Sequence, residues 1–370
     1  MHEPHMAYFV SSPLGDIPVP ENKMYLPLEC DPLKTSYKVY FDAIRNFIEH
    51  DAYSPMRIAI DRSCGRKIGA DEIDEVLIRA EKHGALYHPA SIELIFGPNN
   101  IKFGLNVAVT KTGRNLLKTE FEVIQKIHKK KKLPFLPEVF SYDEQNAISF
   151  LLEEWFEGYH EFHLSKTESG GQMVKLWEFG QGERLLSAEQ SFEVYRQASK
   201  IMTLYYDLND FSQIYPWHHA AGDFIVKADG DHIDVRLTTA RQYDPYMVFQ
   251  QSEQLNPIIA LFFFLLNLTL RMRLDKTDGV GETVWAEDYC LEASVKGFLE
   301  ALRSKQEFKD YFTSEKEFLG ILKAFSQEDF KAAFRPLIDI YGGTNDYQVI
   351  QENMDRHLDT LCFILRNFPA

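Results

Sequence analysis

The chain has 370 residues, of which 45% are hydrophobic and 26% are charged; this composition is typical of a folded globular protein and excludes broad disorder. The formal net charge of -15 disfavours nucleic acid as a partner, because an acidic surface repels phosphate backbones. Cys30, Cys64, Cys290 and Cys362 form no CxxC pair, which argues against a zinc module and, with no signal-peptide pattern, favours a cytoplasmic location. The most apolar segment, 258–270, is shorter than the roughly 20 residues of a membrane span, so we expect no membrane partner.

Residues 1–90 predict a small α+β extension. The segment 56–60 is a short apolar strand candidate, and 71–82 has the pattern of an amphipathic helix that ends at His83-Gly84. An earlier helical pattern, running to about residue 50, places five apolar side chains on one face: Tyr40, Phe41, Ile44, Phe47 and Ile48.

Residues 91–157 change to a strand-rich pattern. Strands are predicted at 92–96 and 101–110, followed by a helix at about 116–128 that ends in a basic run, 128–132, which we interpret as a solvated helix end. A hairpin at 139–155 completes the order strand, turn, strand, helix, strand, strand.

The remaining chain is predicted to be mostly helical. Residues 158–182 are rich in glycine and polar side chains and are interpreted as a connector, and 190–208 has a helical pattern. Beyond Pro245 the pattern is helical, and the acidic, glycine-containing stretch 275–282 is interpreted as a surface loop.

The loop and hairpin at 215–245 concentrate the chemistry of the chain. The segment 224–226 is β-branched or aromatic, Asp229-Gly230 is a two-residue turn signal, and alternation restarts at Ile233, which predicts a β-hairpin. The loop that enters it carries two adjacent histidines and an aspartate, and loops held by a rigid sheet often carry binding or catalytic groups.

The order of elements in 91–157 together with this loop and hairpin resembles the protein kinase-like superfamily, and within it the aminoglycoside phosphotransferase and choline kinase type of small-molecule kinase. The resemblance covers residue 91 to the C-terminus. It implies an α+β, two-lobed protein kinase-like fold, with an antiparallel-sheet N-lobe at 91–157 and a mostly helical C-lobe at 158–370, preceded by the 1–90 extension.

The resemblance also implies a nucleotide site. The strand at 107–111 is similar to the one that carries the phosphate-binding lysine, here Lys111, and Glu120 on the following helix is similar to its glutamate partner. The segment 150–158 is similar to the hinge that meets adenine, which implies contacts at Glu154 and Trp155. ATP and Mg²⁺ are the cofactors implied, with a hydroxyl- or amine-bearing small molecule as the acceptor.

Aligning 219–226 with the His-Gly-Asp-Leu-His-x-x-Asn motif of these kinases places Asp223 at the magnesium-binding asparagine and His218 at the catalytic aspartate. The second magnesium aspartate then falls near Leu237, with Asp234 three residues earlier. A histidine can act as a base near neutral pH, whereas a leucine cannot bind magnesium. No GxGxxG loop is present.

Three functions follow from these residues. The first is a divergent small-molecule kinase, and the second is a pseudokinase that serves as a binding or regulatory module. The third is a metal-dependent hydrolase that uses His218, His219 and Asp223, with His232 and Asp234 as further candidate ligands across the hairpin. Arg236 or Arg241 is expected to pair with Asp223 or Asp244.

Overall fold

The computed structural model describes residues 4–12, 14–81, 84, 86–166, 171–246 and 256–369. The chain is an α+β protein that divides into two compact units, the first comprising 1–158 with the turn 178–182, and the second comprising 159–177 and 183–370. The division after Gly158 lies next to the expected boundary between 91–157 and the rest of the chain.

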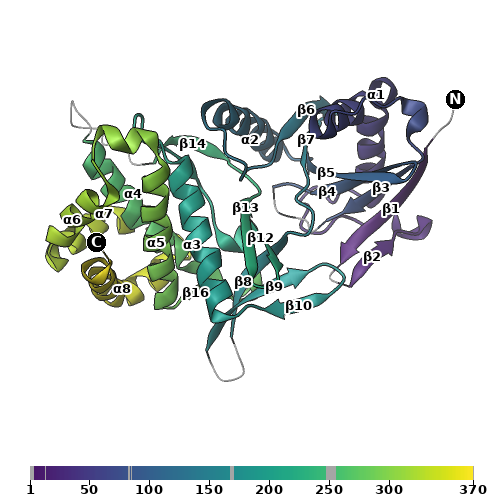
Figure 1. The fold of residues 1–370 in the computed structure, drawn as a ribbon. Helices are drawn as coiled ribbons and strands as arrows, with labels where there is room; N and C mark the ends of the chain where they lie inside the picture. The colour runs from purple at the N-terminus through teal and green to yellow at the C-terminus, as the bar shows by residue number, and fades with distance from the viewer. Residues whose placement is uncertain are drawn as a thin grey trace. The chain divides into compact units, whose positions relative to one another are not determined.

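The first unit is built on one sheet with the strand order β2-β1-β3-β4-β5-β7-β6 (Figure 1). Only β1 and β3 pair in parallel, and the other neighbours are antiparallel. The elements are β1 (His5–Ser12), β2 (Gly15–Pro18), α1 (Tyr37–Cys64), β3 (Glu75–Ala80), β4 (Ala90–Phe96), β5 (Asn99–Ala108), α2 (Lys111–Lys130), β6 (Val139–Gln145) and β7 (Ile148–Glu154).

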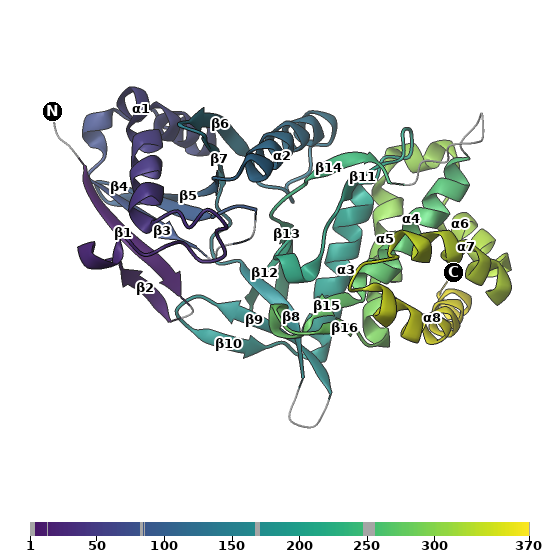
Figure 2. The ribbon, with the colours of Figure 1, turned by 180° about the vertical axis from the view of Figure 1, so that it is seen from behind.

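Helix α1 lies over strands β3, β4 and β5 (Figure 2) and forms one hydrophobic core with them. The Ser36 hydroxyl caps its N-terminus, Gly65 ends it in the left-handed region at φ 66°, and non-helical backbone at 50–53 bends it. The predicted apolar face at 40–48 is confirmed as buried. Because this core also includes Phe103 and Phe150, residues 1–90 share their interior with 91–157.

Helix α2 packs on the opposite face of this sheet. Successive side chains of a strand point to opposite faces, and the residues of β7 that join the core with α1 are Phe150 and Leu152. Glu153 points to the opposite face of the sheet, where burial and the charge of Glu120 on α2 raise its pKa. The sheet is therefore covered by a helix on each side.

Three predictions for the first unit are wrong. The expected strand at 56–60 lies inside α1, and the expected helix at 71–82 contains strand β3 at 75–80. The apolar residues of 71–82 fit the period of a helix as well as that of a strand. Pairing with β1 and β4 stabilises the strand. Strand β5 ends at Ala108, and α2 begins at Lys111, earlier than expected. Lys82 and His83, at the predicted helix end, lie outside the described residues.

The second unit contains a five-stranded sheet, two small two-stranded sheets and helices α3 to α8. The sheet order is β10-β9-β8-β12-β13, and β11 pairs with β14 and β15 with β16. Its strands are β8 (His160–Lys166), β9 (Gln172–Glu178), β10 (Gly182–Leu185), β11 (Ser212–Tyr215), β12 (Phe224–Asp229), β13 (His232–Leu237), β14 (Gln242–Pro245), β15 (Leu274–Lys276) and β16 (Thr283–Trp285). Its helices are α3 (Ala188–Tyr205), α4 (Pro257–Met272), α5 (Asp288–Ser304), α6 (Glu315–Ala324), α7 (Gln327–Ile340) and α8 (Tyr347–Asn367).

Helices α3 and α5 lie side by side (Figures 1 and 2), because small residues allow their backbones to approach. A side chain at Gly297 would collide with the Arg196 carbonyl, and the Ser199 hydroxyl donates to the Ser294 carbonyl at 2.6 Å. The predicted helix at 190–208 and the predicted hairpin at 224–235 are confirmed.

Two predictions for the second unit are wrong. The expected connector at 158–182 contains strands β8 and β9, although 167–170 lie outside the described residues. Phe162, Leu164, Val174 and Leu176 are buried at a period of two, which is a strand signal that the glycines of this region obscured. The stretch 275–282 is not simply a surface loop, because Asp275 is fully buried on β15.

Among the described residues, no helix is both long enough and apolar enough to cross a membrane. The apolar segment 258–270 forms most of α4, whose side chains are largely buried in the second unit.

Candidate functional site

The loop between β11 and β12 holds three of the predicted site residues of the second unit, His218, His219 and Asp223, whereas Asp234 lies on β13. Strand β14 pairs with β11, so the two ends of the segment that contains the loop and the hairpin lie side by side. Between them, residues 219–221 form a single 3-10 turn that ends at Gly222, which has a φ of 69°. At the turn's start, Nδ1 of His218 accepts a hydrogen bond from the Ala220 backbone N–H at 3.0 Å.

Asp223 is 1% exposed, and donors of this same segment use both of its carboxylate oxygens. Nη2 of Arg241 donates to Oδ1 at 2.8 Å, and Nη1 donates to Oδ2 at 2.9 Å. The backbone N–H of His218 also donates to Oδ2, at 2.8 Å. A bidentate guanidinium on a buried carboxylate is a strong, geometrically fixed ion pair. The expectation that Arg236 or Arg241 pairs with Asp223 is confirmed for Arg241.

Asp234 does not lie beside Asp223. It is paired across the hairpin with Lys227, so roughly 13 Å of strand separates it from the backbone of Asp223. Its Oδ2 accepts hydrogen bonds from the Tyr159 hydroxyl at 2.8 Å and from Nη2 of Arg236 at 3.0 Å. Leu237, at the position where the resemblance expects an aspartate, is a buried core residue.

These residues do not fit a magnesium ion. Mg²⁺ needs carboxylate oxygens with free lone pairs directed at one point, and here the Asp223 oxygens face a cation of the protein itself. No group of three or more His, Cys, Asp or Glu side chains that could hold a metal occurs in the described part of the chain. The predicted magnesium pair of Asp223 and Asp234 is therefore wrong as a site.

His218 is positioned as a proton donor rather than as a base. A neutral imidazole has one acceptor nitrogen, and the Ala220 N–H occupies that nitrogen, Nδ1. The proton is thus on Nε2, which lies 3.9 Å from Oδ2 of Asp346. Burial lowers the pKa of His218, and the negative charge of Asp346 opposes that effect.

His219 is a core residue. It is 1% exposed and lies among the rings of Phe162, Tyr195, Trp217 and Phe224, with centroid distances of 5.2 to 5.7 Å. Burial lowers its pKa to about 4, so the ring is neutral at physiological pH. The predicted metal site of His218, His219 and Asp223 is not formed, because these three side chains face different partners.

The sequence-based predictions did not include a buried charge cluster that lies behind this loop. His163 on β8 is 2% exposed in its side chain and lies between two carboxylates, with Nδ1 3.5 Å from Asp275 and Nε2 3.5 Å from Glu161. Asp275 also accepts a hydrogen bond from the Leu164 N–H at 2.8 Å. Burial by itself would lower the pKa of His163, but the interactions with the Asp275 and Glu161 carboxylates outweigh burial and raise it to about 9. The cluster joins β8 to β15, which are 112 positions apart in the chain.

In the first unit, Lys111 and Glu120 do not form the expected pair. Both lie on α2, nine positions apart, so their side chains point to opposite sides of the helix. Lys111 is exposed and Glu120 is 1% exposed. The expectation that Lys111 lies on a strand is wrong, because Thr110 caps the helix in which Lys111 is the first residue.

Glu153 lies near Glu120, and its Oε2 is buried. Burial, together with the charge of Glu120, raises the pKa of Glu153 well above its usual value. Nδ2 of Asn106, on β5, donates to its Oε1 at 2.9 Å. The sheet thus places an amide and a carboxyl group, rather than a lysine, near Glu120.

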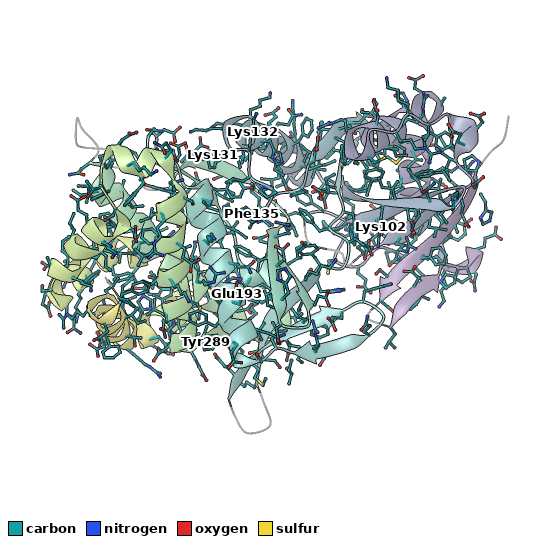
Figure 3. All side chains as sticks on the ribbon, viewed as in Figure 1. Lys102, Lys131, Lys132, Phe135, Glu193 and Tyr289 are labelled. Atoms are coloured by element: carbon teal, nitrogen blue, oxygen red, sulfur yellow. The ribbon has the colours of Figure 1, made fainter. Side chains whose placement is uncertain are left out.

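The two predicted hinge residues have partners within the first unit. Oε2 of Glu154 accepts a hydrogen bond from the Glu138 N–H at 3.2 Å. The ammonium group of Lys102, which is labelled in Figure 3, lies 4.2 Å from the centroid of the Trp155 ring, a cation–π distance.

A scan against protein-family models and a search of curated proteins found no match to this chain. The site is therefore interpreted from its own geometry.

Replacing Arg241 by alanine should destabilise the protein by about 3–5 kcal/mol, because it leaves the buried Asp223 carboxylate without its cation. Arg236→Ala is the matched control, and its loss should be smaller, since the Asp234 side chain keeps 29% exposure and a second partner, the Tyr159 hydroxyl. Urea unfolding measures both, and the double variant Asp223→Asn/Arg241→Ala should recover much of the loss. Equal losses for the two single variants would contradict this account.

The His163 cluster should make stability depend on alkaline pH. The folded pKa of about 9 exceeds the unfolded value of about 6.5, so the contribution is fully present below pH 6.5 and is lost as pH rises through 9. The full contribution is about 3 kcal/mol. Urea unfolding of wild type and His163→Gln from about pH 6 to about pH 10 should show the difference between them shrinking as pH rises. A constant difference would argue against a charged His163.

Glu153→Gln should become increasingly more stable than wild type as pH rises above the unfolded glutamate value of about 4.5. The folded state holds the proton of Glu153 to higher pH than the unfolded state does, so wild-type stability falls over this range. Glutamine keeps the shape and an acceptor for Asn106 without a charge. Melting temperatures from about pH 4 to about pH 8 test this, with the exposed Glu122→Gln as the control. Parallel pH profiles for Glu153→Gln and wild type would contradict it.

Proposed function

We propose that the chain is a divergent protein kinase-like protein that acts as a pseudokinase-type binding or regulatory module, without magnesium-dependent phosphoryl transfer. The order of elements supports the kinase-like part of this proposal. Strands β4 to β7 with α2 between β5 and β6 have the order strand, strand, helix, strand, strand on which the resemblance depends. The β12–β13 hairpin follows the loop at the corresponding place in the second unit.

The observation that carries the non-catalytic part is the ion pair between Asp223 and Arg241. In the kinases that the chain resembles, the residue at this position holds magnesium, and magnesium neutralises charge on the transferred phosphoryl group. Here a guanidinium of the same chain neutralises the carboxylate permanently. The chain thus keeps the loop and replaces the metal's structural role with an arginine.

Two further observations support the same proposal. The acceptor nitrogen of His218 is occupied by the backbone, so this residue is not prepared to remove a proton from a substrate hydroxyl. The pair of Lys111 and Glu120 is not formed, and Glu120 lies instead near Glu153, whose carboxyl group accepts a hydrogen bond from Asn106. Each change removes a different part of the phosphoryl-transfer machinery.

Calorimetric melting with ATP or ADP, with and without Mg²⁺, tests the proposal. A ligand at about 100 times its Kd stabilises the native state by about 2.7 kcal/mol, which such a titration resolves. We expect no magnesium-dependent rise in Tm at millimolar nucleotide, and no ADP formed from ATP in the presence of candidate hydroxyl and amine acceptors.

A magnesium-dependent rise in Tm that is present in wild type and absent in Asp223→Asn would overturn the proposal. A rise with nucleotide alone, equal with and without Mg²⁺, would support a metal-free nucleotide-binding module. Asp234→Asn is the control for the loss of a carboxylate elsewhere on the hairpin, because Asp234 has its own partners, Tyr159 and Arg236.

A further inference from the structure

Helix α2 carries a positive charge that the rest of the chain does not share. Residues 111–132 contain seven lysines, one arginine and two glutamates, which gives a formal charge of +6. The whole chain has a net charge of -15, so the remainder carries -21. Such a local excess of one sign creates a field that attracts partners of the opposite sign.

The lysines of α2 are arranged along its exposed face. Positions 111, 118, 122 and 129 are separated by seven, four and seven residues, so they lie on one side of the helix. Lys111, Lys118 and Lys129 are exposed there, and Glu122 stands between them. The opposite side, with Leu117, Glu120, Ile124 and Ile127, is buried. The three lysines span about 27 Å, calculated from the helical rise.

The C-terminal half of this face is hollowed. A shallow, open depression of about 510 Å³ is lined by Glu122, Gln125, Lys126, Lys129 and Lys130. Figure 3 shows Lys131 and Lys132 just beyond this end of the helix, which extends the positive charge. We name the exposed face defined by Lys111, Lys118, Glu122 and Lys129 the lysine face.

We propose that the lysine face of α2 is a docking surface for an acidic helix of a partner protein. The positive charge of the face calls for a negatively charged partner, and Glu122 favours a protein helix over a nucleic acid. A continuous phosphate backbone would place negative charge against Glu122, whereas a protein helix can present a lysine or arginine there and carboxylates on either side.

The side chains of this face also disfavour nucleic acid. Among α2's residues only Arg114 has a guanidinium, and it is paired with Glu144. The ring of Phe121 stacks on Tyr142, so it is not presented for base stacking. The -21 on the remainder of the chain would repel a long polyanion, while a helix of about 27 Å stays within the lysine face.

Fluorescence anisotropy with a labelled, glutamate-rich helical peptide of about 20 residues, carrying one central arginine, tests the proposal. Binding at about 0.05 M salt should weaken at least tenfold in Lys118→Glu/Lys129→Glu, because both ends of the charge pattern are reversed. The control is Lys309→Glu/Lys316→Glu, which makes the same change of net charge at two exposed lysines of the second unit. Its affinity should change less than about twofold.

A charge exchange at Glu122 tests the orientation of the partner. Wild type should prefer the peptide with a central arginine, and Glu122→Lys should prefer the same peptide with a central glutamate. Circular dichroism and Tm identify a variant that has failed to fold, and the exchange of preference cannot arise from misfolding, because it requires binding by both proteins.

Four outcomes would overturn the proposal. The first is no peptide binding at up to about 1 mM in low salt, where charged surfaces attract most strongly. The second is equal loss in the control variant. The third is tighter binding of a 20-nucleotide single-stranded DNA or of phosphatidylserine vesicles than of either peptide. Self-association that Lys118→Glu/Lys129→Glu abolishes would assign the face to a second copy of the chain and would also overturn it.

Discussion

The second unit depends on one buried ion pair. The Asp223 carboxylate, at the start of β12, receives both terminal nitrogens of Arg241 and the backbone N–H of His218. It therefore fastens the loop after β11, the hairpin and the approach to β14 at a single point. A buried carboxylate is tolerated only with such partners, because removal from water costs several kcal/mol per ion.

The same pair sets the chemistry that the loop can perform. With its oxygens committed to a guanidinium, Asp223 cannot serve as a metal ligand, and the loop conformation that it holds directs the Ala220 N–H at Nδ1 of His218. His219 is left in an aromatic core. Behind it, the cationic His163 lies between Asp275 and Glu161 and joins distant strands. This part of the second unit is organised by ion pairs within the chain.

The first unit uses its sheet differently on its two faces. The face under α1 is a continuous hydrophobic core, in which Phe47 stacks on Phe150 at 4.9 Å. The face under α2 buries two carboxyl groups, Glu120 and Glu153, with Asn106 as the hydrogen-bonding partner of Glu153. Because burial and mutual repulsion raise the pKa of Glu153, that group stays protonated where an ordinary glutamate would be charged. The outer surface of α2 carries the opposite sign, so this helix separates buried acids from exposed lysines.

The sequence alone determined the elements whose signals are local. The hairpin at 224–235 follows from alternation around Asp229-Gly230, the apolar face at 40–48 from helical spacing, and the order of elements after residue 91 from turns and periods. The ion pair of Asp223 with an arginine could also be predicted, because a buried carboxylate requires a cationic or hydrogen-bonding partner. Only the tertiary structure decided the rest. Residues 75–80 became a strand because β1 and β4 pair with it, Lys111 and Glu120 were separated by sharing one helix, and His163 met Asp275 across 112 positions. Such outcomes depend on which surfaces meet, and local periodicity carries no information about that.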